Sequence, residues 1–264
     1  MATQRVHHFH AETTALRARL DHPITQELKP QAFVKLSKEG GYLSEHSQDY
    51  RVEGVVSYKS AYTHVAGHKS PKPGHGWVTL VTAAIEGLNV LDVVTADRVV
   101  GQIATEHPVE GYVPSVTFLG TRFENLRIAG DPVEAKLDLQ ICGPKPDGDK
   151  LYLEDPGFLK RAGSKGNFPG LREQWQQYIK DNDQGKVSKP HASVECSLVS
   201  DVKAGPWKTS GNRIDVPEFG KIFLAELRVD CDTFHLSMIR LEMGCLASGM
   251  MTMCAPIVNG STVP

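Results

Sequence analysis

The chain has 264 residues, of which 40% are hydrophobic and 23% are charged, and its formal net charge is −2. This balance excludes a global electrostatic attraction to nucleic acid or to an anionic membrane surface. No run of the sequence approaches the ~20 apolar residues that a membrane helix needs. The composition predicts a folded, turn-rich protein that can bury a large core.

The cysteines indicate the compartment. There are five of them, an odd number, and no two form a CxxC pair. We therefore expect buried free thiols in a reducing compartment rather than a disulfide framework. The amino-terminal stretch MATQRVHHFHAETT lacks the apolar core of a signal peptide. Together these features predict a cytoplasmic protein.

The amino-terminal region combines a histidine cluster with a helical spacing. Three histidines surround Phe9: His7, His8 and His10. Such a cluster can touch a metal ion, but a frayed terminus is commoner, and we expect one here. Leu16 and Leu20 then stand at i and i+4, which predicts a short helix over residues 11–20 that docks on one edge of the fold.

Strand patterns begin after this helix. Residues 32–36 and 51–59 are two candidate strands, the second with Gly54 as a bulge in its apolar series. The region from Trp77 to Ile141 is rich in Val, Ile, Leu, Thr and Phe, is interrupted by glycines, and shows no 3.6-residue periodicity. It predicts consecutive β-strands. The last of them alternates most clearly, with apolar residues at every odd position from Val133 to Ile141.

The character of the chain changes over residues 143–192, which are polar and rich in Gly and Pro. This stretch is too long for a simple hairpin connection, so we expect an irregular insert. Inside it, four apolar residues at i, i+4, i+7 and i+8 predict one amphipathic helix: Leu171, Trp175, Tyr178 and Ile179. The insert is either a solvated surface excursion or a lid.

Strands resume at Ser193 and continue over residues 221–229 and 233–243. The apolar positions are even up to Met238 and odd from Ile239 onward, which we interpret as a β-bulge near Met238. Strands with Gly-rich turns and only two short helices argue against a βαβ repeat. The sequence therefore predicts one all-β domain over residues 1–264, built as an antiparallel sandwich or closed barrel with a short N-terminal helix and a small helical insert.

The best candidate site is a histidine pair. His68 and His75 flank the segment KSPKPG, whose prolines and glycine predict a hairpin loop that would set the two imidazoles about 5 Å apart. That separation suits a divalent metal, whereas His64 is roughly 13 Å from His68 along an extended strand. Otherwise both are ordinary polar residues beside a turn. A third ligand would come from nearby strand ends: Glu86, Asp92, Asp97, Glu106 or His107.

Other chemistry has little support. The patterns GxSxG, HExxH, GxGxxG and GxxxxGK[ST] are all absent, so neither an activated serine nor a phosphate-binding loop is indicated. The sulfur-rich tail could bind Cu(I), but thioethers that fill core gaps are far commoner. Its members are Met250, Met251, Met253 and Cys254.

Three stretches carry a family resemblance. They are HVAGHKSPKPGHGWVTLVTAAIEGLNVLDVVTADRVVGQIATEHPVEGY, VTFLGTRFENLRIAG and IDVPEFGKIFLAEL. They resemble a family of uncharacterised bacterial β-rich proteins, and they are more distantly similar to secreted proteins of the choice-of-anchor type. The resemblance covers about two thirds of the chain and implies no activity, cofactor or catalytic residue.

The functional expectation follows from a regular sheet without a catalytic constellation. We expect a binding or interaction module that self-associates as a homo-oligomer and can also take a small-molecule ligand. The alternative is an enzyme, assisted by a metal at His68 and His75, with its site in a barrel mouth under the 143–192 insert.

Overall fold

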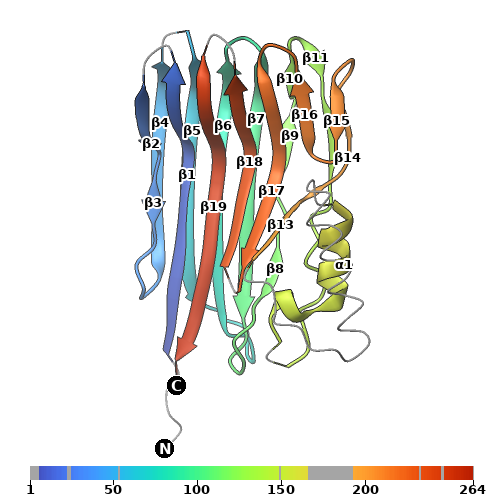
Figure 1. Ribbon diagram of the computed structural model, residues 1–264. Helices are drawn as coiled ribbons and strands as arrows, with labels where there is room; N and C mark the ends of the chain where they lie inside the picture. The colour runs from blue at the N-terminus through green and yellow to red at the C-terminus, as the bar shows by residue number, and fades with distance from the viewer. Residues whose placement is uncertain are drawn as a thin grey trace, which may run out of the picture.

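The computed structural model describes residues 6–22, 25–52, 54–148, 150–165, 193–231, 233–244 and 247–263. Two large antiparallel sheets lie face to face, and we call them the front and back sheets as they appear in Figure 1. The order of the front sheet is β15-β16-β17-β18-β19-β1-β2, with β13 also on β17 and β3 also on β1. Its strands are β1 (Val6–His22), β2 (Gln26–Gln31), β3 (Val34–Lys35), β13 (Val194–Ser197), β15 (Lys208–Ser210), β16 (Arg213–Val216), β17 (Gly220–Asp230), β18 (Thr233–Gly244) and β19 (Ser248–Val263).

The back sheet has the order β11-β10-β7-β6-β5-β4, with β8 and β9 also on β7. A separate two-stranded sheet pairs β12 with β14. These strands are β4 (Gly41–Val52), β5 (Val56–Lys69), β6 (Trp77–Val90), β7 (Val94–His107), β8 (Ser115–Thr117), β9 (Arg122–Glu124), β10 (Arg127–Ile128), β11 (Asp131–Pro132), β12 (Glu134–Leu137) and β14 (Val199–Lys203). Both large sheets end on edge strands. The all-β prediction is therefore confirmed as a sandwich, and the described residues form no closed barrel.

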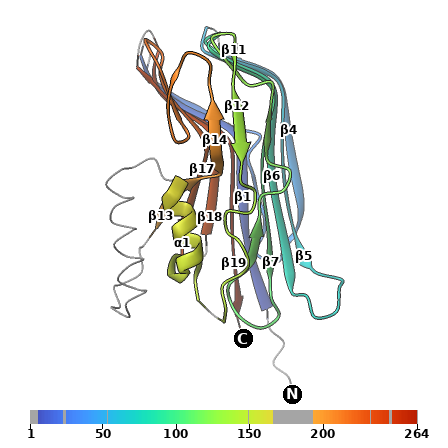
Figure 2. The same ribbon diagram turned by 90° about the vertical axis from the view of Figure 1, so that its right-hand side faces the viewer.

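The helical part of the fold is small. A 3₁₀ turn, η1 (Tyr152–Glu154), leads into α1 (Pro156–Lys165), which lies beside β13 (Figure 2). The helix begins where the Asp155 carboxylate accepts hydrogen bonds from the N–H groups of Gly157 and Phe158. The Asp-Pro pair at this point is a helix-start signal that the prediction of an irregular insert overlooked. The helix predicted around Leu171–Ile179 lies outside the described residues.

The predicted N-terminal helix is wrong. Residues 6–22 form β1, which pairs with β19 along nearly its whole length. The spacing of Leu16 and Leu20 misled the prediction because four residues is also a multiple of the two-residue strand period. The strand predicted over residues 51–59 is likewise divided, since β4 ends at Val52 and β5 begins at Val56, with Gly54 in the turn at φ 68°.

The phase slip at Met238 is confirmed, but its cause is not a bulge. Strand β18 keeps one register with β19 on both sides of the slip, so no residue is inserted. By the strand registers, Met238 lies between Ala225 of β17 and Cys254 of β19, whose φ angles are 47° and 48°. Ala15 of β1 continues the line. At this front crease (Ala225, Met238, Cys254, Ala15) all four strands exchange their inward and outward positions.

The back sheet has the same construction. Asp49 of β4 and Gly87 of β6 have φ angles of 49° and 64°, and Asn125, between β9 and β10, has 51°. The registers place Lys59 and Asp97 between them, which completes the back crease. Strands β5, β6 and β7 exchange inward and outward positions there. One residue with a positive φ angle in every second strand thus exchanges the inward and outward side-chain positions without a change of register.

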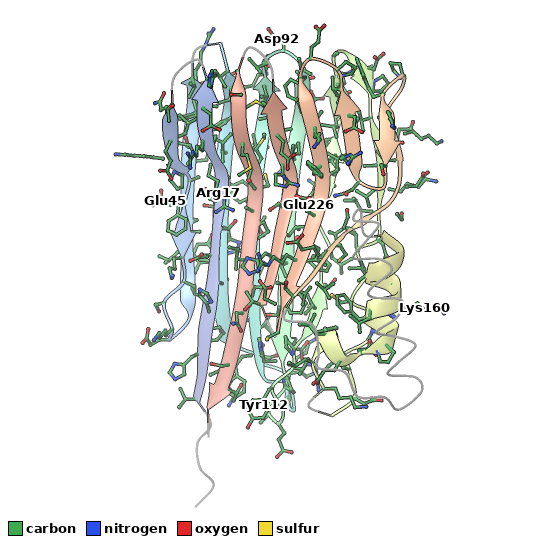
Figure 3. The ribbon with its side chains drawn as sticks, in the orientation of Figure 1. Arg17, Glu45, Asp92, Tyr112, Lys160 and Glu226 are labelled. Atoms are coloured by element: carbon green, nitrogen blue, oxygen red, sulfur yellow. The ribbon has the colours of Figure 1, made fainter. Side chains whose placement is uncertain are left out.

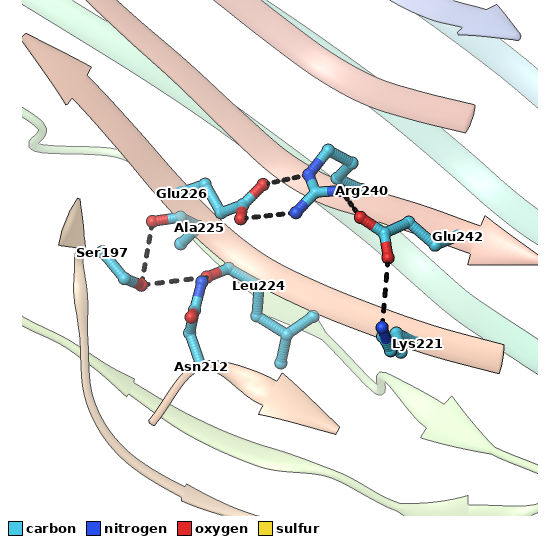
Figure 4. Close-up of polar contacts among 8 residues, drawn as sticks. All are labelled: Ser197, Asn212, Lys221, Leu224, Ala225, Glu226, Arg240 and Glu242. Carbon is cyan, nitrogen blue, oxygen red and sulfur yellow. Dashed lines mark hydrogen bonds and ion pairs between the residues drawn. The ribbon is translucent and has the colours of Figure 1, made fainter. Parts of the chain in front are cut away.

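Polar side chains complete the hydrogen bonding of the front crease (Figure 4). At Ala225, β17 changes its neighbour from β16 to β13, which interrupts the ladder at the Leu224 carbonyl, while the Ala225 carbonyl accepts from the N–H of Leu198 at 2.9 Å. The hydroxyl of Ser197 lies 2.9 and 3.0 Å from these two oxygens, and the amide of Asn212 donates to Leu224 at 2.7 Å. Side chains therefore replace a missing strand at this point.

An ion-pair network crosses the crease on the solvent side of the same sheet (Figure 4). The Arg240 guanidinium contacts Glu226 at 2.6 and 3.0 Å and Glu242 at 2.5 Å. It also lies 3.8 Å from the ring centre of Phe223, a buried residue on this outward face. Because Arg240 and Glu226 lie on opposite sides of the crease, their pair ties the two halves of the sheet together.

Ser197→Ala is expected to lower the free energy of unfolding by about 1 to 2 kcal/mol. The substitution leaves two buried carbonyl oxygens with one partner fewer, which costs more than loss of an exposed hydrogen bond. Urea unfolding followed by circular dichroism measures the change. Ser237→Ala on the neighbouring β18 is the matched control and should cost less than about 0.5 kcal/mol. Equal losses in the two variants would contradict the role given to Ser197.

Candidate functional site

The histidine pair predicted from the sequence is not a cross-strand pair. The hairpin between β5 and β6 is present, but its register places Val78 opposite His68. His75 lies in the loop, where its Nδ1 contacts the carboxylate of Glu106. Within the described ranges, no group of three or more His, Cys, Asp or Glu side chains could hold a metal ion. Metal binding by His68 and His75 stays a prediction.

The enzyme alternative stays a prediction, although the barrel mouth expected for its site has no counterpart among the described residues. The described strands leave both sheets open, so there is no barrel mouth. The described part of the 143–192 insert, with α1, packs beside β13 through Phe158, Leu159 and Ala162. This portion is part of the continuous core.

The frayed terminus expected around Phe9 is also wrong. Strand β1 is paired with β19 from Val6 onward, so the histidines lie on an ordered strand. Alternation along the strand sends His7 inward, where only 4% of its surface is exposed. There it meets His107 from the end of β7, on the opposite sheet, at 4.5 Å between ring centres. The two histidines, one from each sheet, thus form a buried pair.

The surroundings of this pair keep both rings neutral. His7 stacks on Trp77 at 5.1 Å and its Nδ1 lies 3.0 Å from the hydroxyl of Thr262. Its Nε2 and both nitrogens of His107 have no hydrogen-bond partner of good geometry. Burial, helped by the charge of His8, lowers the pKa of His7 to about 4. Burial and then His7 lower the pKa of His107 to about 3, with the Gly260 backbone opposing part of this shift.

The two rings contribute to the packing of the core, and their contribution to stability depends on pH. They are 4% and 1% exposed, so a substrate cannot reach them, and no carboxylate is among the groups that shift their pKa values. Neutral imidazoles are tolerated in this environment, whereas an imidazolium would be a buried, unpaired charge.

Strand β4 is the most exposed long element of the fold. It has 12 residues, forms one edge of the back sheet and, among the described strands, pairs with β5 alone. Figure 3 shows Glu45 at this edge. Residues 41–46 are all exposed, so this half of the strand lies outside the sandwich on both faces. Tyr42 is 67% exposed and Leu43 is 46% exposed. An edge of this kind presents free backbone groups beside apolar side chains.

The other edges of the two sheets are short or blocked. At the edge of the front sheet beside β1, β2 has six residues and includes Lys29 and Pro30. At the far edges, β15 has three residues and β11 has two. Lysine, proline and short length are the usual protections against edge-to-edge pairing. Strand β4 has neither Lys nor Pro, and its one inward-pointing charge is Glu45.

The outward face of the back sheet continues the exposed surface of β4. Tyr42 contacts the ring of His64 at 4.6 Å, and the register aligns it with Leu80 of β6 through β5. Tyr62, 38% exposed, lies in the next apolar row with Ala84 and Val100. A polar row of Ser44, His64, Thr82 and Gln102 separates the two apolar rows, and Ala84 and Val100 are buried. The large exposed apolar side chains of this region are therefore Tyr42 and Leu43 on β4 and Tyr62 on β5.

Comparison with known proteins identifies the family. A family model described as "Domain of unknown function (DUF8256)" matches residues 7–230. The chain belongs to this family. No curated protein and no solved structure matches the chain. The residues matched to DUF8256 run from β1 through β17, and β18 and β19 then fill the front sheet between β17 and β1.

Within this DUF8256 chain, sequence reasoning missed both the buried histidines and the exposed edge. Along β1, His7 shares its parity with Phe9 and Ala11, which is a strand signal that could have placed it in the core. Nothing in GYLSEHSQDYRV marks it as an edge, because that depends on which strand lies beside it. In the part of the chain that the structure describes, no helix has the length and apolar character to cross a membrane.

Proposed function

We propose that this protein is an interaction module that self-associates through β4, with a second copy pairing its own β4 antiparallel to the first. The observation that carries the proposal is the exposure of residues 41–46 on both faces, next to an unpaired backbone edge. A second strand would supply partners for those backbone groups and cover Tyr42 and Leu43.

A second copy of the chain suits this edge better than an unrelated strand. Two identical strands related by a two-fold axis form a closed dimer, so the association stops at two copies. A pairing centred on Ser44 sets Tyr42 opposite His46 of the second copy and Leu43 opposite its Glu45. A pairing centred on Glu45 would instead place two carboxylates face to face, which is unfavourable. The charges along the strand therefore favour the register with Ser44 at the centre.

The adjacent sheet face supports the same assembly. Pairing of two β4 strands would join the two back sheets into one continuous sheet. The rows that contain Leu80, Ala84 and Val100 would then continue into the second copy. Ala84 and Val100 are already buried in each copy, so the gain is a longer hydrogen-bonded sheet and the cover of Tyr42 and Leu43.

Leu43→Glu is expected to weaken self-association at least tenfold. The substitution puts a second carboxylate opposite Glu45 of the other copy, and the two-fold axis makes this repulsion count twice. Sedimentation equilibrium across a concentration series measures the dissociation constant. Hydrogen exchange gives a second readout, because the amides of residues 41–48 should exchange more slowly as wild-type protein is concentrated.

Met250→Glu is the control for this experiment. Met250 is 56% exposed on the front sheet, away from β4, so its substitution should leave the dissociation constant unchanged. Circular dichroism checks that both variants fold. A wild-type protein that stays monomeric at millimolar concentration, or equal effects of the two substitutions, would refute association through β4.

The cellular setting is a further part of the proposal. Cys142 and Cys254 are buried free thiols and Cys231 is an exposed one, which supports a reducing, cytoplasmic location. A bacterial origin and a distant relation to the choice-of-anchor type rest on the sequence resemblance alone. A small-molecule ligand is compatible with an interaction module, and a divalent metal at His68 and His75 stays a prediction.

A further inference from the structure

A pocket of about 360 Å³ lies at the end of the sandwich where the β6–β7 turn is found. This end is opposite the chain termini, as the position of Asp92 in Figure 3 shows, and the two sheets are spread apart here (Figure 2). The volume is within the range of small-molecule sites. Its apolar lining comes from five separate connections between strands and includes Leu91, Val93, Trp207, Val216 and Phe219.

The walls of the pocket are held by backbone and indole hydrogen bonds. The indole N–H of Trp207 donates to the carbonyl of Ile128 at 3.3 Å, which ties the loop after β14 to the back sheet. The N–H of Phe219 donates to Val216 at 3.2 Å, and the carbonyl of Phe219 accepts from Gly244 at 3.0 Å. Because the one polar atom of the indole is already bonded, its ring faces remain for apolar contact. The lining is thus preformed.

One charged side chain, Glu218, belongs to the lining. It lies in the turn between β16 and β17 with a φ angle of 63°, a conformation set by that turn. It takes part in no ion pair with any other described residue. An acid beside an indole ring is a combination that attracts an organic cation, through the carboxylate and through the negative face of the ring.

We propose that this pocket binds a small apolar molecule that carries one amine, with its hydrocarbon body against Trp207 and Phe219 and its ammonium group at Glu218. Lining by turns is typical of ligand sites at the ends of sandwiches, where loops vary while the sheets stay fixed. The site is at the other end of the molecule from the buried histidines and is independent of association through β4.

Three probes with one hydrocarbon body and different charges test the proposal: 4-phenylbutylamine, 4-phenylbutanol and 4-phenylbutyrate. Isothermal titration calorimetry on the full chain should give the amine a dissociation constant about three- to fivefold lower than that of the alcohol, with the acid weakest. Glu218→Gln should remove the preference for the amine and leave the alcohol unchanged. An amine no tighter than the alcohol, or no binding of any probe, would overturn the proposal.

Trp207→Ala should weaken binding of all three probes by at least about tenfold. Because that substitution also removes a packing contact, Ala247→Leu provides a second test of the site. Ala247 lines the pocket, and a larger side chain there would occupy the space without removal of any wall residue. Undiminished binding in Ala247→Leu, with the fold intact by circular dichroism, would show that the probes bind elsewhere and would refute the site.

Discussion

Acidification from pH 6.5 to about 4 is expected to lower the free energy of unfolding by roughly 5 kcal/mol through His7 and His107. Burial lowers their pKa values in the folded protein to about 4 and about 3, against 6.5 for an ordinary histidine. The unfolded chain therefore binds protons at a pH where the folded chain cannot. Each histidine makes the free energy of unfolding fall with decreasing pH, with a slope that approaches about 1.4 kcal/mol per pH unit.

The direction of the effect follows from which state takes the proton. Above pH 6.5 both states hold neutral rings, so the pair adds no pH dependence there. Below that value only the unfolded state gains protons, and stability falls until the folded rings titrate as well. The groups that face the pair are Trp77, Thr262 and the Gly260 backbone, with His8 nearby, and none of them is an acid that could hold an imidazolium.

Urea unfolding at a series of pH values from 4 to 8 measures the slope. His107→Leu should remove about half of the slope below pH 6.5, and the double variant with His7→Leu should remove most of it. His22→Gln, at the exposed end of β1, is the control and should leave the slope as in the wild type. A slope that survives in the double variant would show that other groups cause the pH dependence.

Gly101→Ala is expected to lower the free energy of unfolding by about 2 to 3 kcal/mol. Gly101 lies on β7, facing the front crease. A Cβ atom there would lie 2.9 Å from Cγ of Met238, 3.0 Å from the carbonyl oxygen of Cys254 and 3.2 Å from Cδ of Pro256. Two of these neighbours belong to the crease itself, whose left-handed Cys254 also donates its thiol to the Val99 carbonyl. The neighbours have no room to retreat, so the added methyl group overpacks the core.

Gly244→Ala is the matched control, because Gly244 is also on a strand and no described atom lies within 4 Å of a Cβ built there. That substitution should be neutral or slightly stabilising, since alanine loses less conformational freedom than glycine on folding. Thermal and urea unfolding of both variants distinguish the two cases. An equally small effect of Gly101→Ala would mean that the sheets can separate at the crease at little cost.

Much of the sheet architecture could be predicted from the two-residue rhythm of the chain. Strands β6 and β7 and the strands after Ser193 were recognised because alternation is a local property that burial of one face imposes. The strand predicted from Val133 to Ile141 is shorter than expected, since β12 covers Glu134–Leu137 and its side chains are exposed or half-buried. The same rhythm located the phase slip between Met238 and Ile239. Its cause could not be predicted, since the left-handed residues that produce it, Ala225 and Cys254, belong to neighbouring strands.

The candidate surfaces could not be predicted from local periodicity. An i, i+4 spacing fits both periods, so Leu16 and Leu20 were assigned to a helix although their neighbours continue a strand. The edge at β4 depends on which strands pair, and the pocket beside Trp207 is assembled from turns far apart in the chain.

The amino-acid sequence alone determined that this protein is a stack of antiparallel strands, because periodicity records which side chains avoid water. Only the tertiary structure decided that His7 meets His107, that β4 has a free edge and that Glu218 stands beside an indole. Each of those arrangements joins residues from distant parts of the chain, and the pairing order of the strands is fixed by long-range packing rather than by local pattern.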